Sequence, residues 1–163
     1  MNAIELLRAQ HRKIEWLLEE LQSLSEKAVR RRHRLVAQLG DLLSIHAALE
    51  ERIFYPGVNR ASTEDLLLKS LEEHLSVKRL LADLLQLEEW MPTFAPKVEV
   101  LREQVLHHIA QEEERLFTKV EMLVPHEQLE LMGMTMERAT ASLEAQAPRF
   151  DVLAQTDGAW PLE

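Results

Sequence analysis

Residues 35–53 have the sequence LVAQLGDLLSIHAALEERI, and their pattern indicates the fold of the whole chain. Their apolar positions recur at alternating steps of three and four residues, which is the period of an α-helix with one buried face. Three other segments repeat the pattern, so the sequence predicts four amphipathic helices. On each helix the positions with this spacing form one stripe along the buried face. The four stripes consist of Ile4, Leu7, His11, Ile14, Leu18 and Leu21; Leu35, Leu39, Leu42, His46, Leu49 and Ile53; Leu67, Leu71, His74, Leu81 and Leu85; and Val98, Leu101, Val105, His108, Glu112, Leu116 and Val120.

Histidine occupies one position in each stripe where leucine would be expected. A lone histidine on an apolar face is usually a core residue with its hydrogen bonds satisfied, but here the polar positions repeat in phase. The pattern of His46 and Glu50 recurs 62 residues later as His108 and Glu112. Each copy follows a helix that carries its own stripe histidine, and these two histidines are 63 residues apart. We interpret the set as the ligands of a metal centre. Its members are His11, His46, Glu50, His74, His108 and Glu112.

The spacing of these residues explains how they could hold metal. Residues four apart lie on one helix face with Cβ atoms about 5–6 Å apart, so the histidine and glutamate of each copy can converge. In the simplest arrangement each of two cations takes two histidines, and Glu50 and Glu112 bridge between them. Imidazole and carboxylate suit iron, manganese or zinc. Such a set leaves positions open for water, dioxygen, peroxide or nitric oxide.

Helix breakers predict the boundaries and the topology. We expect helices over residues 3–25 and 29–55, with Pro56-Gly57 stopping the second. The third helix should run from a cap at Ser62 or Thr63 to near Trp90, the fourth from Thr93 or Pro96 to Pro125, and a fifth over 126–145. Short connections join antiparallel neighbours. The fold class is therefore all-α, an up-down-up-down four-helix bundle with a short additional C-terminal helix. Residues 1–146 form this domain, and residues 147–163 form a tail that packs back or is disordered at its end.

Composition narrows the classes of protein. The formal net charge of −9 disfavours general nucleic-acid binding, and we interpret the basic run over residues 30–34 as a solvated helix start. The absence of cysteine excludes disulfides, thiolate zinc sites and iron–sulfur clusters. Neither a signal-peptide apolar region nor a run of about 18 apolar residues occurs, so a soluble cytoplasmic protein without membrane contact is the default expectation.

Residues beside the stripes receive a structural interpretation. Glu51 and Glu113 could accept hydrogen bonds from ligand imidazoles, but we favour exposed helix glutamates. Lys78 could face the site, but we favour a lysine whose ammonium reaches the surface. Three further histidines, His33, His107 and His126, are assigned to the surface or to the surroundings of the site. Three methionines, Met132, Met134 and Met136, are assigned to packing.

The strings HAALEERIFYP, residues 46–56, and HIAQEEERLF, residues 108–117, resemble the hemerythrin-like HHE cation-binding domain. The resemblance covers about residues 5–123 and includes the two upstream histidines. It implies a four-helix bundle with two non-haem iron ions, often joined by an oxygen bridge, with manganese or zinc less favoured. By this resemblance the iron ligands are His11, His46, Glu50, His74, His108 and Glu112.

One departure separates the chain from oxygen-carrying hemerythrins. Those proteins have a further histidine one turn after the third-helix ligand, where this chain has Lys78. The expected function is therefore a di-iron protein that binds or reacts with dioxygen, peroxide or nitric oxide. Whether it is an enzyme or a non-enzymatic oxygen or iron carrier or sensor stays open, and so does a third alternative, a helical interaction protein with structural histidines. A small diatomic or peroxide ligand is the expected partner, and any protein partner is unknown.

Overall fold

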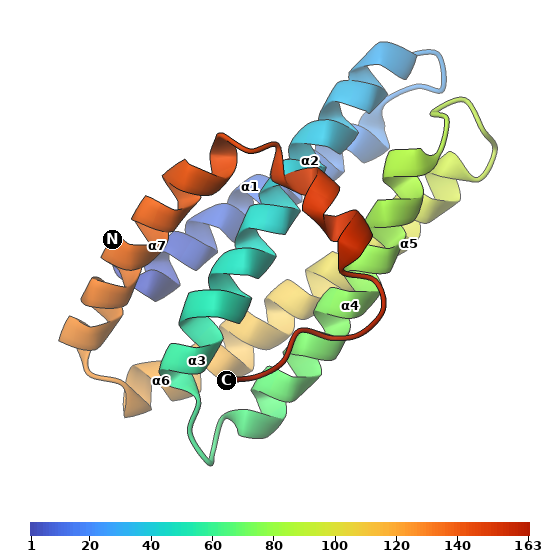
Figure 1. The fold of residues 1–163 in the computed structure, drawn as a ribbon. Coiled ribbons are helices and arrows are strands. Elements are labelled where there is room, and N and C mark those ends of the chain that lie inside the picture. The colour runs from blue at the N-terminus through green and yellow to red at the C-terminus, as the bar shows by residue number, and fades with distance from the viewer.

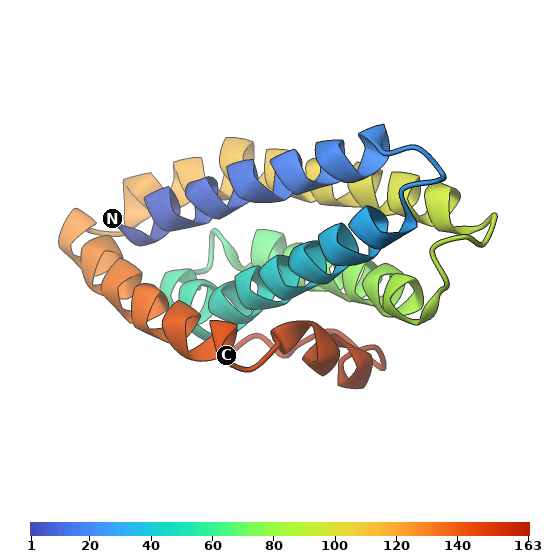
Figure 2. The same cartoon turned by 90° about the horizontal axis from the view of Figure 1, so that it is seen from above.

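The computed structural model describes residues 1–163, and all its regular structure is helical. Two antiparallel hairpins make the bundle: α1 (Ala3–Ser23) with α2 (Val29–Leu49), and α4 (Glu64–Gln86) with α5 (Phe94–Gln111). Both hairpin loops lie at the same end of the molecule (Figure 1; Figure 2). A further helix, α7 (His126–Glu144), packs against α1 and α2. The predicted fold class is confirmed.

Each of the helices α2 and α5 continues into a π-helical turn. The first turn, η1 (Glu50–Phe54), leads to α3 (Tyr55–Val58), and the second, η2 (Glu112–Leu116), leads to α6 (Phe117–Leu123). The backbone N–H of Tyr55 donates to the carbonyl of Glu50, five residues earlier, and Phe117 repeats this bond to Glu112. Such turns are rare and concentrate at functional sites. Here they begin at the two glutamates that the sequence predicts as ligands.

The second helix therefore does not stop at Pro56-Gly57, and that prediction was wrong. Pro56 lies in the first turn of α3, where a missing backbone N–H is tolerated. The chain leaves helical geometry only at Asn59. The third helix starts after Thr63 as expected, but it ends at Gln86, four residues before Trp90. None of the helices has the length and apolarity needed to cross a lipid bilayer.

The buried apolar side chains form two clusters with the predicted ligands between them. One cluster lies around the π-helical turns and includes Leu7, Phe54 and Phe117. The other lies toward the hairpin loops and includes Ile14 and Leu101. On α1, for example, the sequence passes from the first cluster to the second across His11. The polar layer is thus enclosed above and below by apolar side chains, which keep bulk water away.

The C-terminal segment, residues 147–163, packs on the bundle. Packing was one of the two alternatives that the sequence left open for this segment. Its 3-10 helix η3 (Pro148–Ala154) contacts both α2 and α4 and runs from one to the other (Figure 1). Val152 is buried in the second apolar cluster. Nη1 of Arg149 donates to both carboxylate oxygens of Asp41, at 3.1 Å to Oδ1 and 2.9 Å to Oδ2. Gly40 permits this close approach, because a Cβ atom there would lie 3.1 Å from the Cβ of Arg149.

Candidate metal centre

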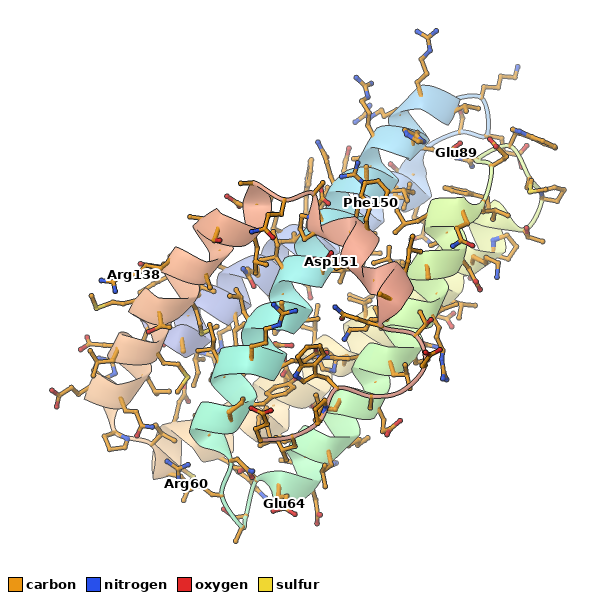
Figure 3. The ribbon with its side chains drawn as sticks, in the orientation of Figure 1. Arg60, Glu64, Glu89, Arg138, Phe150 and Asp151 are labelled. Atoms are coloured by element: carbon orange, nitrogen blue, oxygen red, sulfur yellow. The ribbon has the colours of Figure 1, made fainter.

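The six residues predicted as ligands come together in one buried layer. His11 comes from α1, His46 and Glu50 from α2 and its π-helical turn, His74 from α4, and the remaining two from α5 and its turn. All are at most 6% exposed. Other charged side chains, such as those of Arg60, Glu64 and Arg138, lie at the surface instead (Figure 3). The complete set is His11, His46, Glu50, His74, His108 and Glu112.

The polar atoms form two groups that could each hold a cation. The first combines His11 and His46 with Glu50 and Glu112, and the second combines Glu50 with His74 and His108. Within each group the ligand atoms lie within 4.8 Å of one another. Glu50 belongs to both, with one carboxylate oxygen 2.9 Å from the Nε2 of His46 and the other 3.0 Å from the Nε2 of His74. Glu50 is therefore placed between the two groups, as a bridging ligand would be.

Several of these atoms approach one another without making hydrogen bonds. Oε1 of Glu50 and Oε2 of Glu112 are buried and have no hydrogen-bond partner, although imidazole nitrogens lie nearby. Oε2 of Glu112 is 3.3 Å from the Nε2 of His11 and 3.6 Å from that of His108. Unpaired buried carboxylate oxygens are costly unless something else satisfies them. Nitrogen and oxygen donors that converge in this way fit a hard or borderline metal cation.

Paired imidazoles face each other in both groups. The Nε2 atoms of His11 and His46 are 3.2 Å apart, and those of His74 and His108 are 3.3 Å apart. In each pair one protonated nitrogen can donate a hydrogen bond to the other, but two protonated nitrogens would repel each other. If neither nitrogen carries a proton, both lone pairs can bind the same cation, and this repulsion is absent. The donor set of the chain therefore fits a metal pair.

Electrostatics keep the carboxylate charge in place despite burial. Burial opposes ionisation of Glu50, but the imidazoles of His46, His108 and His74 outweigh it and hold its pKa well below the usual range. Burial also opposes protonation of His108, yet Glu112 and Glu50 raise its pKa well above the usual value. For His46 burial wins, and its pKa is lowered. Without metal, the layer is thus held by ion pairs between the carboxylates and protonated histidines.

The Nδ1 atoms, on the far side of the imidazole rings, meet a second set of acceptors. His11 pairs with Glu113 at 2.8 Å and His74 with Glu51 at 2.9 Å. These acceptors come from the opposite hairpin and directly follow Glu112 and Glu50. Accepting the Nδ1 proton leaves Nε2 as the nitrogen that can bind metal, and it fixes the ring orientation.

The other two imidazoles are oriented by residues that directly precede site histidines. Oε1 of Gln10 is 2.8 Å from the Nδ1 of His46. The equivalent residue of the second hairpin, Glu73, places a carboxylate oxygen 3.6 Å from the Nδ1 of His108, too far for a hydrogen bond but close enough for charge attraction. Every Nδ1 atom therefore has an acceptor nearby.

Three expectations for neighbouring residues were wrong. Glu51 is 3% exposed rather than a surface glutamate, and Glu113, with a side chain 25% exposed, is also bonded to a site histidine. Lys78 is buried, and its ammonium contacts both oxygens of Glu51 at 2.7 and 3.0 Å. Burial of a lysine is expensive unless it is paired, and here the carboxylate of Glu51 pairs it. Lys78 thus neutralises the acceptor of His74.

Tyr55 is a site residue that the sequence analysis missed. Its hydroxyl donates to Oε1 of Glu112 at 2.8 Å and lies 3.2 Å from the Nε2 of His74. Burial, together with the charges of Glu112 and Glu50, raises the pKa of Tyr55 well above its usual value, so the phenol keeps its proton. In both copies of the repeat an aromatic residue stands five positions after the glutamate, as Tyr55 and Phe117. That recurrence was the available signal.

Residues assigned away from the site are placed as expected, with one partial exception. The side chains of His33, His107 and His126 are 59–72% exposed. Met132 and Met136 pack in the first apolar cluster, whereas Met134 is half exposed. None of the six contributes to the buried polar layer.

Known proteins share the sequence pattern and the fold of this chain. The family model for the hemerythrin HHE cation-binding domain matches residues 2–120. The chain belongs to this family. A crystal structure of a hemerythrin HHE cation-binding domain-containing protein from Mycobacterium kansasii has the same fold, with a TM-score of 0.82 at 21% identity; the match covers 95% of this chain and 99% of that one.

A curated relative extends the comparison to a longer protein. A protein from Nostoc sp. named DNA nickase is 27% identical over 144 residues, 88% of this HHE-domain chain. The match spans only 40% of that relative's length. The likeness therefore concerns one part of the Nostoc protein.

Proposed function

We propose that this HHE-domain protein holds a non-haem di-iron centre and uses it to bind or react with a small oxidant such as dioxygen, peroxide or nitric oxide. The observation that carries the proposal is the convergence of imidazole nitrogens with carboxylate oxygens that lack hydrogen-bond partners. The family model supports a bound cation. The proposed ligands are His11, His46, Glu50, His74, His108 and Glu112.

The donor chemistry supports iron over the alternatives. The groups supply only imidazole and carboxylate, and the chain has no cysteine to favour a soft metal. Zinc would fit the donors but has no redox chemistry, and it is usually satisfied by four ligands. Manganese shares the ligand preferences of iron and is the nearer alternative. When bound, two irons would supply electrons and open coordination positions to a small oxidant.

The residues of the chain have distinct tasks in this proposal. Glu50 neutralises charge in both groups, because it contacts histidines of both hairpins. Tyr55 keeps its proton and donates a hydrogen bond to Glu112 within a water-poor layer. Apolar clusters on either side exclude bulk water, which strengthens each of these interactions.

Two modes of action are compatible with this site. A reactive protein would turn over peroxide or nitric oxide, whereas a carrier or sensor would bind dioxygen or iron reversibly. The buried phenol of Tyr55, which holds a proton beside the ligands, favours reaction with peroxide or nitric oxide. We therefore place reaction first and reversible carriage second.

The name of the Nostoc relative concerns DNA, and this chain offers little support for the same role. Its formal net charge is −9, whereas DNA binding draws on clustered positive charge. Four of the residues over 30–34 form an exposed basic patch, but Arg32 is buried and donates to the backbone carbonyl of Glu89 at 3.2 Å. We propose a small molecule, rather than nucleic acid or membrane, as the partner.

Metal analysis combined with absorption spectroscopy tests the proposal. Protein from iron-replete medium should contain two irons per chain, and its visible spectrum should change on adding peroxide or nitric oxide. A His74→Ala variant should hold one iron per chain instead of two, and its spectral change should shrink with the lost iron. Purified protein with no stoichiometric transition metal would refute the proposal, and a reversible change with dioxygen alone would favour the carrier.

A further inference from the structure

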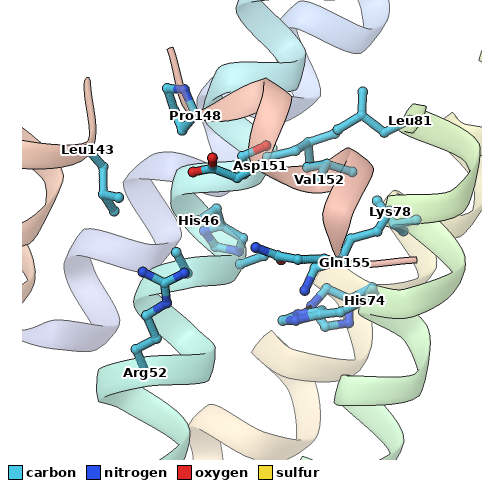
Figure 4. Close-up of a pocket in the computed structure, with 16 residues that line it drawn as sticks. His46, Arg52, His74, Lys78, Leu81, Leu143, Pro148, Asp151, Val152 and Gln155 are labelled. Carbon is cyan, nitrogen blue, oxygen red and sulfur yellow. Dashed lines mark hydrogen bonds between the residues drawn. The ribbon is translucent and has the colours of Figure 1, made fainter. Parts of the chain in front are cut away.

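A cavity leads from the surface to the candidate metal centre between α2, α4 and the C-terminal segment (Figure 4). Its volume open to water-sized molecules is about 50 Å³, enough for a few such molecules. His46, His74 and His108 line its inner end, and the exposed Asp151 lies at its outer end. A path of this size between solvent and three proposed ligands suits an entrance.

The C-terminal segment forms the outer wall of this cavity. Pro148, Val152 and Gln155 all line it, although the four-helix bundle is complete without them. Gln155 lies between His46 and His74 in the close-up (Figure 4). Its backbone N–H donates to the carbonyl of Val152 at 3.0 Å, so its position is fixed at the end of η3. Gln155 is therefore the polar side chain of the wall that faces the histidines.

Contacts on both sides of Gln155 hold the wall in place. Before it, Arg149 is paired with Asp41 of α2. After it, the Nε of Arg79 on α4 donates to the carbonyl of Thr156 at 2.9 Å. Further on, the guanidinium of Arg52 lies over the ring of Trp160 at 5.1 Å. The segment is tied to both helices that it bridges, so the entrance has a defined width.

The lining indicates which molecules can pass. Leu43, Val77, Leu81 and Leu143 supply apolar walls, and the ammonium of Lys78 is already paired with Glu51. Small neutral molecules cross such a lining without losing strong hydration, whereas ions pay a desolvation cost. The amide of Gln155 can offer a hydrogen bond to a molecule that passes it.

We propose that this cavity is the entry route for a small neutral oxidant and that Gln155 sets the width of the passage. The inference rests on the proposed metal centre, because it assigns a route to that centre. A residue that sets the width of a passage differs from a residue that binds the ligand in one measurable respect. Narrowing the passage slows entry and exit by the same factor and leaves the equilibrium affinity unchanged.

Nitric oxide binding to the iron-loaded, reduced protein provides the test, with iron content measured first for every variant. In Gln155→Trp, the indole should fill the passage, so the association and dissociation rate constants should both fall by about tenfold. In Gln155→Ala both should rise. Asp157→Trp is the matched control, because it adds the same ring at an exposed position two residues outside the cavity.

A second variant narrows the passage from the helical side. Ala47 on α2 lines the cavity, so Ala47→Leu should slow both rate constants, whereas Ala37→Leu, on the same helix but outside the cavity, should not. Loaded variants whose rates match the controls would overturn the entry route and leave the metal centre standing. Protein that takes up no iron at all would instead refute the proposed function, and the entry route with it.

Discussion

The candidate metal centre has two halves with equivalent histidines and different surroundings. The first half-site, His11 and His46, comes from the hairpin of α1 and α2, and the second half-site, His74 and His108, comes from the hairpin of α4 and α5. The facing Nε2 atoms are 3.2 Å apart in the first and 3.3 Å apart in the second. The repeat has thus preserved the donor geometry closely.

The aromatic residues against the two half-sites differ by one hydroxyl. Phe117 stacks on His11 with ring centroids 5.8 Å apart, and Tyr55 stacks on His74 at 5.5 Å. Both residues follow their π-helical turns at equivalent positions. Only the second half-site therefore has a phenol, and that phenol donates to Glu112.

Charge around the Nδ1 atoms differs as well. In the first half-site His46 faces the neutral amide of Gln10, whereas in the second His108 faces the carboxylate of Glu73. His46 has a lowered pKa, with burial as the main cause. His108 has a raised pKa, to which Glu73 contributes beside Glu112 and Glu50. The same pair of buried histidines, present twice, therefore has different protonation behaviour because different residues lie beside the Nδ1 atoms.

The largest effect should come from removing the residue that the two half-sites share. Glu50→Ala deletes the carboxylate that contacts both His46 and His74, so both irons should be lost rather than one. Glu114→Ala, an exposed glutamate near the equivalent position of the repeat, should keep both. Iron per chain, measured by elemental analysis, checks the pair. Retention of full iron by the Glu50 variant would show that it bridges nothing.

Removing one histidine from either half should have about half that effect. His11→Ala and His74→Ala each take one imidazole from one pair, so each should keep the metal of the intact half-site. Iron content and the loss of iron–iron magnetic coupling are the measurements. If either variant lost both metals, the halves would behave as a single unit, and the comparison between them would lose its meaning.

Exchanging the aromatic residues should have a moderate effect on stability. Tyr55→Phe leaves Oε1 of Glu112 without its phenol donor, which should cost about 1–3 kcal/mol of unfolding free energy in the metal-free protein. Phe117→Tyr adds a hydroxyl beside His11 in an apolar cluster and should also destabilise. Urea denaturation of metal-stripped protein measures both. A Tyr55 variant as stable as the parent would show that its hydrogen bond contributes nothing net.

Exchanging the Nδ1 partners should have the smallest effect, seen in the pH profile. A raised histidine pKa stabilises the fold below the unfolded value of about 6.5, and this stabilisation is lost as pH rises through the folded pKa. Glu73→Gln removes one carboxylate that raises the pKa of His108, so the alkaline loss of stability should begin at lower pH. Gln10→Glu should favour the protonated form of His46 and extend stability toward higher pH.

Denaturation of metal-free protein across neutral and mildly alkaline pH measures these shifts. Glu103→Gln, which removes the same charge at an exposed position of α5, is the control for Glu73→Gln. Profiles that coincide for the parent and both exchanged variants would mean that the two half-sites have the same protonation despite their different neighbours.

The apolar period made the bundle and the positions of the six buried polar residues predictable. His11, His46, His74 and His108 stood in leucine positions, and a helical stripe points to the interior wherever the helices pack. The π-helical turns were not predictable in this way, because one extra residue in a turn leaves little trace in composition. In a regular helix Tyr55 would lie about 140° around the axis from Glu50, which removes it from the site.

The sequence also did not predict which charged residues outside the stripes are buried. The sequence alone places Glu51 and Lys78 at the surface. Only tertiary packing brings the ammonium of Lys78 within 2.7 Å of Glu51 and the carboxylate of Glu51 within 2.9 Å of the Nδ1 of His74. The position of Gln155 depends on where the tail crosses α2 and α4, which no local pattern fixes. Contacts between segments far apart in sequence therefore had to come from the structure.

An anomalous difference map at the iron edge, from crystals of the iron-loaded protein, tests the central claim most directly. We expect two peaks inside the bundle, one beside the Nε2 atoms of His11 and His46 and one beside those of His74 and His108, with Glu50 between them. A map with no peak in the buried layer, or with a single peak outside it, would show that these residues do not hold a metal pair.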